Sequence, residues 1–367
     1  MIELRNDSLV FSFPEVHPSA TVSIEFQRSL RIPDDDKDYP LPPGLGRFPL
    51  RHVDDFADRV ASSWIRHGGV MLPMYQSEAM WLNFHAEYDD ERRTYYPFAI
   101  KIATGKINAV SGRAWADGIQ RRPRQDYVVV PEQPWLDGYC VGKGIIRQFV
   151  AMPLGAGYTA EEQITGKAEH GGLQIMAFPM KREAFEKRFP RCPRREREVM
   201  YSMVRECAPC ASDMGLAPGG RMKQEIYHDK YALPDWDLDH GSRCFVHIAN
   251  SMVWRQITGS NPPTTPPTSA EYTRAGLPWF LWYDDKNSTL QGSETLATMK
   301  SVATLGKKMK DVPLPENQSV SAESIITLRR GLTKDQVRET QIPARRRGSY
   351  AHDIATRQTD RSPRGAD

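Results

Sequence analysis

Residues 126–179 most constrain how this chain can fold, because two apolar strand patterns there are interrupted by loops. One loop, residues 132–138, carries a tryptophan and two carboxylates, and the other, residues 155–159, is rich in glycine. Short apolar runs that lie this close together in sequence favour a mainly antiparallel sheet or sandwich. We therefore expect this segment to form the centre of a β-rich fold.

Alternating apolar residues predict further strands in the first half of the chain. Val22, Ile24 and Phe26 alternate with Ser23, Glu25 and Gln27 up to Arg31, which predicts a sheet with one face open to water. Residues 98–110 predict a hairpin that turns at Thr104-Gly105, and strands are also expected at 127–130, 145–152 and 173–178.

Helix signals are fewer in the first half and more frequent after Pro190. Apolar spacing predicts helices over 53–66, 194–208, 242–258 and 294–305. Thr159 and Thr268 each stand three residues before a glutamate, the pattern of a capping box at a helix start. The 367 residues exceed what one core usually supports. We predict an α+β protein with a β-rich domain at 1–190, a helix- and loop-rich domain packed on it at 191–311, and a disordered basic tail at 312–367.

Charge and cysteine content indicate the compartment and the partners. The net charge of +3 is concentrated after residue 325, where ten basic residues face five acidic ones, so the preceding body carries −2. A nearly neutral body argues against nucleic-acid binding through the folded part. The N-terminus lacks a signal peptide, no run approaches the ~20 apolar residues of a membrane span, and the five cysteines are odd in number. We expect a soluble, cytoplasmic protein without a membrane span.

No motif identifies a cofactor or a metal. Cys207-Ala208-Pro209-Cys210 could be a redox pair, half of a zinc site completed from Cys192, Cys244, His240 and His247, or simply structural thiols. Its position after a charged helix argues against the redox pair, and the missing second C-x-x-C spacing argues against zinc. A predicted helix would place His240, Cys244 and His247 on successive turns, where packing is a commoner role than catalysis. The paired glycines lack the nucleotide-binding patterns and are interpreted as turns. We predict no cofactor and no metal.

The residues chosen as a candidate binding site are Glu132, Trp135, Asp137, Arg147 and Gln148. Trp135 beside Asp137, and the aromatic run 279–283, pair large apolar faces with acids, as partner-binding or sugar-binding surfaces do. The alternative is that these aromatics close the core. Arg147 on an apolar strand requires a wet face or a buried carboxylate, for which Glu132 and Asp137 are candidates.

Long specific segments resemble an uncharacterised family of bacterial and fungal proteins. These segments are residues 41–49, 133–138, 147–155 and Arg243-Cys244-Phe245-Val246-His247, within a similarity that covers residues 22 to about 305. The resemblance implies no activity. Members are sometimes described as integral membrane proteins, a description that no segment of this chain supports.

Two functions remain open. The first is an interaction or structural module whose loops, including Trp135 and Asp137, contact another protein. The second is an enzyme of unrecognised type whose Glu132, Asp137, Arg147 and Gln148 converge in a pocket. Oligomeric state is not indicated by the sequence.

Overall fold

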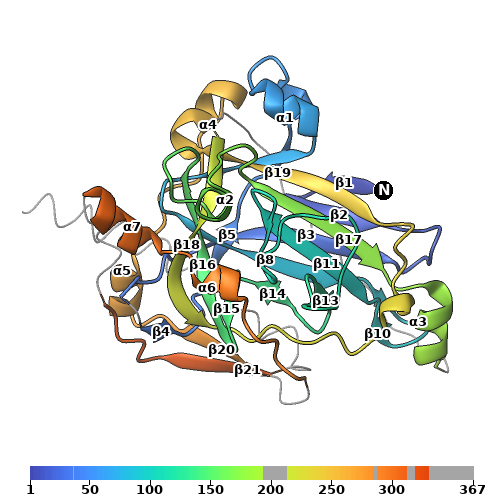
Figure 1. Cartoon of the computed structure of the whole chain (residues 1–367). Coiled ribbons are helices and arrows are strands. Elements are labelled where there is room, and N and C mark those ends of the chain that lie inside the picture. The colour runs from blue at the N-terminus through green and yellow to red at the C-terminus, as the bar shows by residue number, and fades with distance from the viewer. Residues whose placement is uncertain (36, 193–212, 284–286, 312–318, 330–367) are drawn as a thin grey trace, which may run out of the picture.

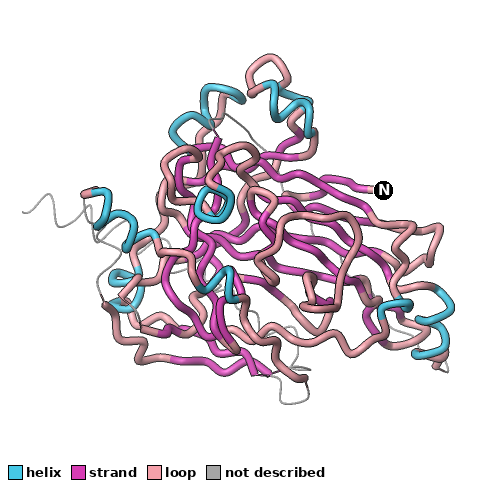
Figure 2. The backbone as a smooth tube through the Cα atoms, in the orientation of Figure 1, coloured by secondary structure: helices cyan, strands magenta, loops and turns pink. Residues whose placement is uncertain are grey.

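The fold is built on one large, mainly antiparallel sheet (Figures 1 and 2). We describe it from a computed structural model, which defines residues 1–35, 37–192, 213–283, 287–311 and 319–329. A continuous path of antiparallel pairs runs β1–β2–β3–β8–β16–β18–β19–β17–β11. The β-rich, mainly antiparallel fold class predicted from the sequence is confirmed.

The strands of this path are β1 Ile2–Arg5, β2 Ser8–Ser12, β3 Thr21–Ser29, β8 Ala79–Ala86, β11 Phe98–Thr104, β16 Ile145–Pro153, β17 Leu173–Pro179, β18 Asp213–Lys223 and β19 Ser242–Asn250. Shorter strands of the same sheet are β4 Asp38–Tyr39, β5 Gly44–Arg47, β6 Arg51–His52, β7 Val70–Met74, β12 Ile107–Asn108, β13 Val128–Val130, β14 Trp135–Leu136 and β15 Gly138–Gly142. Two small separate sheets contain β9 Tyr88–Asp89 with β10 Thr94–Tyr95, and β20 Trp279–Tyr283 with β21 Ile325–Arg329.

Several predicted strands and turns are confirmed. The hairpin of β11 and β12 pairs Ala103 with Asn108 and Thr104 with Ile107, around the predicted Thr104-Gly105 turn. The strands expected at 127–130, 145–152 and 173–178 correspond to β13, β16 and β17.

The prediction that β3 has one face open to water is wrong. Val22, Ile24 and Phe26 lie in the main apolar core, as expected, but Glu25 and Gln27 on the opposite face are buried as well. The Glu25 carboxylate accepts hydrogen bonds from Gln27 Nε2 on the same strand and from Asn83 Nδ2 on β8, at 3.1 and 3.2 Å. Burial is therefore compatible with the polar sequence of that face.

The helices are short and lie around the sheet (Figure 2). They are α1 Ser62–His67, α2 Ala160–Thr165, α3 Arg182–Arg188, α4 Ser251–Thr258, α5 Ser269–Arg274, α6 Glu294–Ala297 and α7 Val302–Met309, with 3₁₀ turns η1 Asp54–Phe56 and η2 Leu233–Asp235. Both predicted capping boxes are present, at Thr159 for α2 and at Thr268 for α5.

Three predicted helices are corrected. The helix expected over 53–66 consists of η1 followed by α1, and the one expected over 294–305 is divided into α6 and α7, because Ser301 caps a new helix start by accepting from Thr304 N. The helix expected over 242–258 is a strand, β19, followed by α4, whose first turn is capped by the Asn250 side chain. The helix predicted over 194–208 and the pair Cys207 and Cys210 lie outside the described residues.

The second half of the chain contributes strands to the same sheet. β18 and β19 come from the region predicted to be rich in helices, yet they lie between β16 and β17 in the sheet. The boundary near residue 190 stays a prediction. The expectation that disorder begins at residue 312 is wrong for β21, which pairs in parallel with β20 and buries Leu328.

Candidate functional site

The five residues proposed from the sequence as a site are largely buried, and their polar contacts lead to other parts of the chain. Glu132 pairs with Lys230, and Asp137 accepts a hydrogen bond from Gln224 Nε2 at 2.6 Å. Gln148 is equally buried. Burial leaves Glu132, Asp137 and Gln148 little surface to offer a partner in this conformation.

Gln148 and Arg147 both hold the segment that follows β3. Gln148 Nε2 donates to Leu30 O at 2.8 Å, and its Oε1 accepts from Ile32 N at 3.0 Å. The side-chain amide of Gln148 therefore bonds the backbone of residues 30 and 32 as a neighbouring strand would. Arg147 Nη1 lies 3.5 Å from Asp34 Oδ1 and donates to Gly219 O at 3.0 Å. A buried carboxylate does accompany Arg147, as expected, but it is Asp34 rather than Glu132 or Asp137.

The two tryptophan segments noticed in the sequence meet in space. The Trp135 ring makes edge-to-face contacts with Trp81 and Trp282, at centroid distances of 6.1 and 5.1 Å. Trp135 and Trp81 are buried in the main core. These contacts fit the interpretation that the aromatics close the core.

A different set of residues, the histidine cluster, gathers at the end of the sheet beside α1. It consists of Trp64, His67, His170, Phe245 and His247. Phe245 and His247 alternate along β19 and share one face, while the two α1 residues are three apart and share a helix face. The His67 ring lies flat on Phe245, with centroids 4.4 Å apart and planes at 7°, and Trp64 stacks on His247 at 4.6 Å. His170, from the loop between α2 and β17, completes the cluster, and its ring centroid lies 6.0 Å from that of His67.

Two identical triplets build this arrangement. His67-Gly68-Gly69 precedes β7, and His170-Gly171-Gly172 precedes β17. These strands flank β19, and the first residue of each, Val70 and Leu173, pairs with the same residue, Val246. The two histidines are therefore delivered to β19 from its two sides.

The second glycine of each triplet permits a close approach of the backbone to β19. Gly69 has φ +92°, and a Cβ there would stand 2.2 Å from the Phe245 carbonyl oxygen. Gly172 has φ +49°, and a Cβ there would stand 2.4 Å from Val246 O. Only glycine fits both the conformation and the space without displacing the strand.

A buried carboxylate fixes the loop that carries His170. Glu161, in the first turn of α2, accepts hydrogen bonds from the backbone N–H groups of Glu169, His170 and Gly171 at 2.9 to 3.3 Å. Charge-assisted bonds of this kind are among the stronger ones in proteins. Glu161 is therefore a positioning residue for His170.

The surroundings keep the imidazoles neutral near neutral pH. Burial lowers the pKa of His247 to about 4, even though its ring is 3.1 Å from Gly68 O. Burial also lowers the pKa of His67 and His170, and Lys106 adds to both shifts. Several shifted pKa values in one place are a common property of functional sites. Neutral imidazoles can accept a proton or a hydrogen bond from a bound molecule.

The predicted helix that would group His240, Cys244 and His247 is not formed, because Cys244 and His247 lie on strand β19. Cys244 and His247 are three residues apart on β19, so their side chains point to opposite faces of the sheet. His240 lies before this strand, and its Nδ1 is 2.9 Å from Asp237 Oδ2. His67 and His170 were missed. The signal that would have found them is the repeated His-Gly-Gly triplet, in which Gly68-Gly69 is interpreted from the sequence only as a helix end and Gly171-Gly172 only as a turn.

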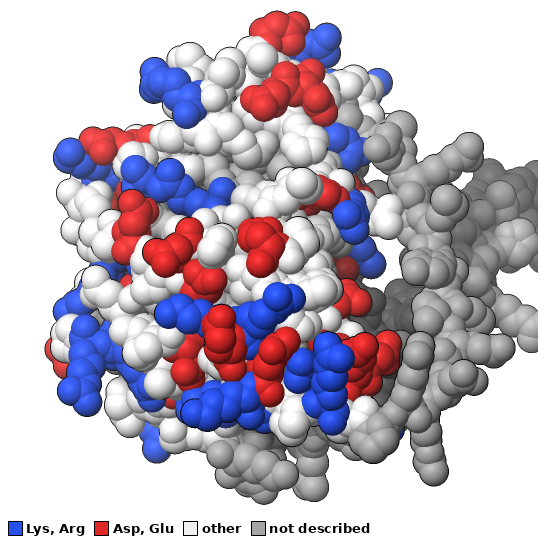
Figure 3. Space-filling model, turned by 90° about the vertical axis from the view of Figure 1, so that its right-hand side faces the viewer, with Lys and Arg blue, Asp and Glu red and all other residues white. Residues whose placement is uncertain are grey.

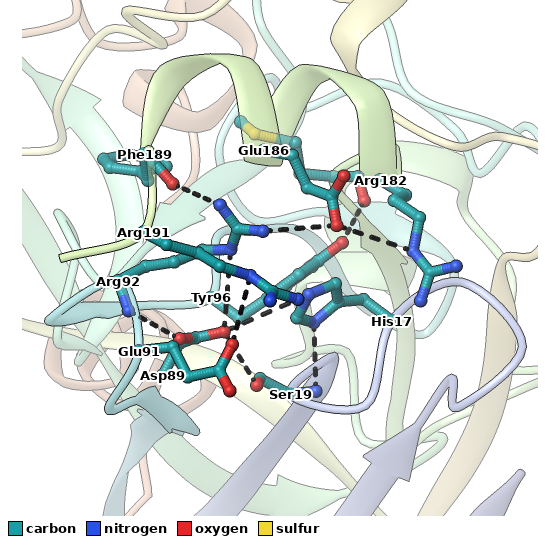
Figure 4. A network of polar contacts seen from close by, with 11 residues as sticks. His17, Ser19, Asp89, Glu91, Arg92, Tyr96, Arg182, Glu186, Phe189 and Arg191 are labelled. Carbon is teal, nitrogen blue, oxygen red and sulfur yellow. Dashed lines mark hydrogen bonds and ion pairs between the residues drawn. The ribbon is translucent and has the colours of Figure 1, made fainter. Parts of the chain in front are cut away.

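A second polar network, around His17, fastens α3 to the sheet (Figure 4). His17 stacks on Tyr96 with centroids 5.2 Å apart, and Asp89 accepts from Arg92 N at 2.8 Å. Arg92 reaches α3 through an ion pair with Glu186 at 3.2 Å. These side chains are engaged with one another across three segments, and we assign the network a structural role.

We searched the described residues for metal-binding groups, membrane-spanning helices and patches of like charge. Within them, no group of three His, Cys, Asp or Glu residues is placed to hold a metal ion. None of their helices is both long enough and apolar enough to cross a membrane. On the face shown in Figure 3, acidic and basic side chains are interspersed.

Comparisons of the chain with protein-family models, curated proteins and solved structures found no match. The resemblance to an uncharacterised family stays an expectation. Function is therefore argued from the site alone.

Proposed function

We propose that the protein binds a small ligand at the histidine cluster and that His67 and His170 contact it. One observation carries the proposal: two His-Gly-Gly triplets, far apart in sequence, converge on the two sides of β19. Both histidines are half-buried, so they combine partial access with a lowered pKa. This combination suits a group that exchanges protons or hydrogen bonds with a ligand.

The chemistry available is acid–base chemistry. A neutral imidazole offers one donor and one acceptor nitrogen, and Phe245 beneath His67 provides a flat apolar support. If the protein is an enzyme, this cluster supplies its proton-transfer groups, in place of the pocket predicted around Glu132 and Arg147.

NMR of the imidazole resonances tests the proposal. The protein, labelled with ¹⁵N-histidine, is mixed with a panel of amino acids, sugars, carboxylic acids and phosphates. Resonances are assigned with single His→Ala variants. We expect at least one compound to shift His67 and His170 saturably while leaving the exposed His228 unchanged. A panel that shifts neither histidine, or shifts His228 equally, would contradict the proposal.

The second candidate, an interaction with another protein, has support beside the same cluster. Trp64 of α1 and Trp254 of α4 belong to one small apolar cluster, so the two helices are packed together at the end of the sheet (Figure 1). Their outer sides expose Ile65 and Met252, the latter 75% exposed. Exposed apolar side chains at a protruding end are a common feature of binding surfaces.

Affinity purification of partners tests this candidate. Met252→Glu and Ile65→Glu should reduce recovery of a bound protein, whereas Met309→Glu, at an exposed methionine of α7, should not. Equal recovery with all three variants would exclude the α1–α4 surface. The predicted cytoplasmic location stays a prediction.

A further inference from the structure

Positive charge surrounds the two half-buried histidines. After burial, the largest influences on the pKa of His67 are His170, Lys106, Arg66 and Arg243, all of which lower it. After burial, Lys106 is also the largest influence on the pKa of His170 and lowers it, whereas Glu161 and Glu169 raise it. These cations come from the β11–β12 turn, from the last turn of α1 and from β19.

The carboxylates nearby are already engaged. Glu161 accepts three backbone N–H groups. Glu169 lies 3.0 Å from Lys167 and 3.8 Å from His170, and Asp117 lies 3.6 Å from Arg243. On the other side of the cluster, Asp213 accepts the indole N–H of Trp64.

Two of these cations, Lys106 and Arg66, differ from Arg243 in their contacts with described carboxylates. Within the part of the chain that the structure describes, neither Lys106 nor Arg66 forms an ion pair with a carboxylate. Lys106 is half-buried, and its backbone N–H donates to Gln174 Oε1 at 2.5 Å, which fixes the turn that carries it. The same turn lies against the loop that carries His170, since Gly105 N donates to Gly171 O and Gly172 O at 3.2 and 3.1 Å. A cation on this turn that forms no ion pair with a described carboxylate favours an incoming negative charge.

We infer that the ligand of the histidine cluster carries an anionic group, a carboxylate or a phosphate, that Lys106 binds this group, and that His67 and His170 take up protons as it binds. The inference rests on the proposed ligand site. An anion within about 4–6 Å of an imidazole favours its charged form, so binding raises the pKa of both histidines. By linkage, the anion binds more tightly as the pH falls through the range where they titrate.

The probes are inorganic phosphate and acetate, each compared with sodium chloride at equal ionic strength. The imidazole resonances are titrated with pH in each solution. We expect at least one anion to raise the pKa of His67 and His170 by about one unit and to leave His228 unchanged. A response to phosphate alone assigns a phosphate ligand, and a response to acetate alone assigns a carboxylate.

Variants at Lys106 separate recognition from bulk charge. Lys106→Met should weaken binding of the responding anion about tenfold at pH 6, and Lys106→Arg should retain most of it. Lys143→Met removes an exposed lysine at the β15–β16 turn and should leave binding unchanged. Thermal melts confirm that the variants are folded.

The inference is overturned if neither anion shifts the two histidines or if Lys106→Met binds like the wild type. Should a neutral compound of the ligand panel shift His67 and His170 while both anions fail, the ligand site stands and only its anionic character is wrong. Should nothing shift the two histidines, the proposed site itself fails.

Discussion

Gly172 lies at φ +49° so close to β19 that a Cβ would stand 2.4 Å from the Val246 carbonyl oxygen. Its counterpart Gly69 approaches Phe245 in the same way. Both glycine pairs are visible in the sequence, where Gly68-Gly69 indicates a helix end and Gly171-Gly172 indicates a turn. The sequence could not show that both turns flank one strand, because strand neighbours are set by pairing between distant segments. The histidines that precede them were therefore missed.

Replacing Gly172 by alanine should lower the free energy of unfolding by about 3 kcal/mol, through left-handed strain together with displacement of β19. Gly166→Ala is the matched control. Gly166 has φ +73° and nothing within 4 Å of an added Cβ, so only the strain of about 1 kcal/mol applies. Urea denaturation measures the free energy of unfolding of both variants. Equal losses of stability would show that the contact with Val246 O leaves room for a Cβ.

Histidine burial predicts a loss of stability in mild acid. Burial lowers the pKa of His247 to about 4 in the folded state, against about 6.5 when unfolded. The unfolded chain therefore binds the proton first, and the stabilisation is present above pH 6.5 and lost as the pH falls below it. The pKa of Glu25 lies at about 2 despite burial, because His85 and Arg47 favour its charged form. Its contribution to the free energy of unfolding is therefore lost only below about pH 4.5 and does not affect this range.

From pH 7 to pH 5, His247 alone should remove about 2 kcal/mol from the free energy of unfolding. His247→Phe keeps a ring against Trp64 and should make the pH dependence correspondingly shallower. The measurement is urea denaturation at a series of pH values. An unchanged slope in the variant would show that His247 is not held neutral by the fold.

At the scale of elements, a strand was predicted as a helix where its apolar residues also fit the 3.6-residue helical spacing. Phe245, Ile248, Ala249 and Met252 satisfy helical spacing, but the first of these residues belong to β19, and the helix begins only at the Asn250 cap. Local signals with a specific hydrogen-bond pattern were predicted well, as the capping boxes of α2 and α5 show. The strand β21 could not be recognised, because its isolated apolar residues become meaningful only beside β20.

Removal of β21 tests the corrected view of the C-terminal region. Ending the chain after Leu314 should lower the melting temperature by about 5 °C, since it removes the pairing with β20 and the burial of Leu328, which is 2% exposed. A chain that ends after Arg329 keeps both and serves as the control. Identical melting temperatures for the two truncated chains would show that β21 adds nothing to the fold.

At the scale of the whole molecule, the fold class could be predicted because alternation and turn signals recur along the chain. The order of the strands in the sheet could not be predicted, because β18 and β19 lie between β16 and β17, which come from the first half of the chain. The burial of the predicted site residues could not be predicted for the same reason. Glu132, Asp137 and Gln148 have the composition of a recognition surface, yet they are buried once distant segments such as those of Gln224 and Leu30 pack on them.

The central claim is that His67 and His170 form one electrostatically coupled site beside β19. The most direct test is an NMR pH titration of their imidazole resonances without ligand, in the wild type and in His170→Ala. The structure predicts that His67 titrates below the usual value of about 6.5, and that its pKa rises in His170→Ala because a neighbouring cation-forming group is lost. A His67 that titrates at the usual value in both proteins would contradict the account.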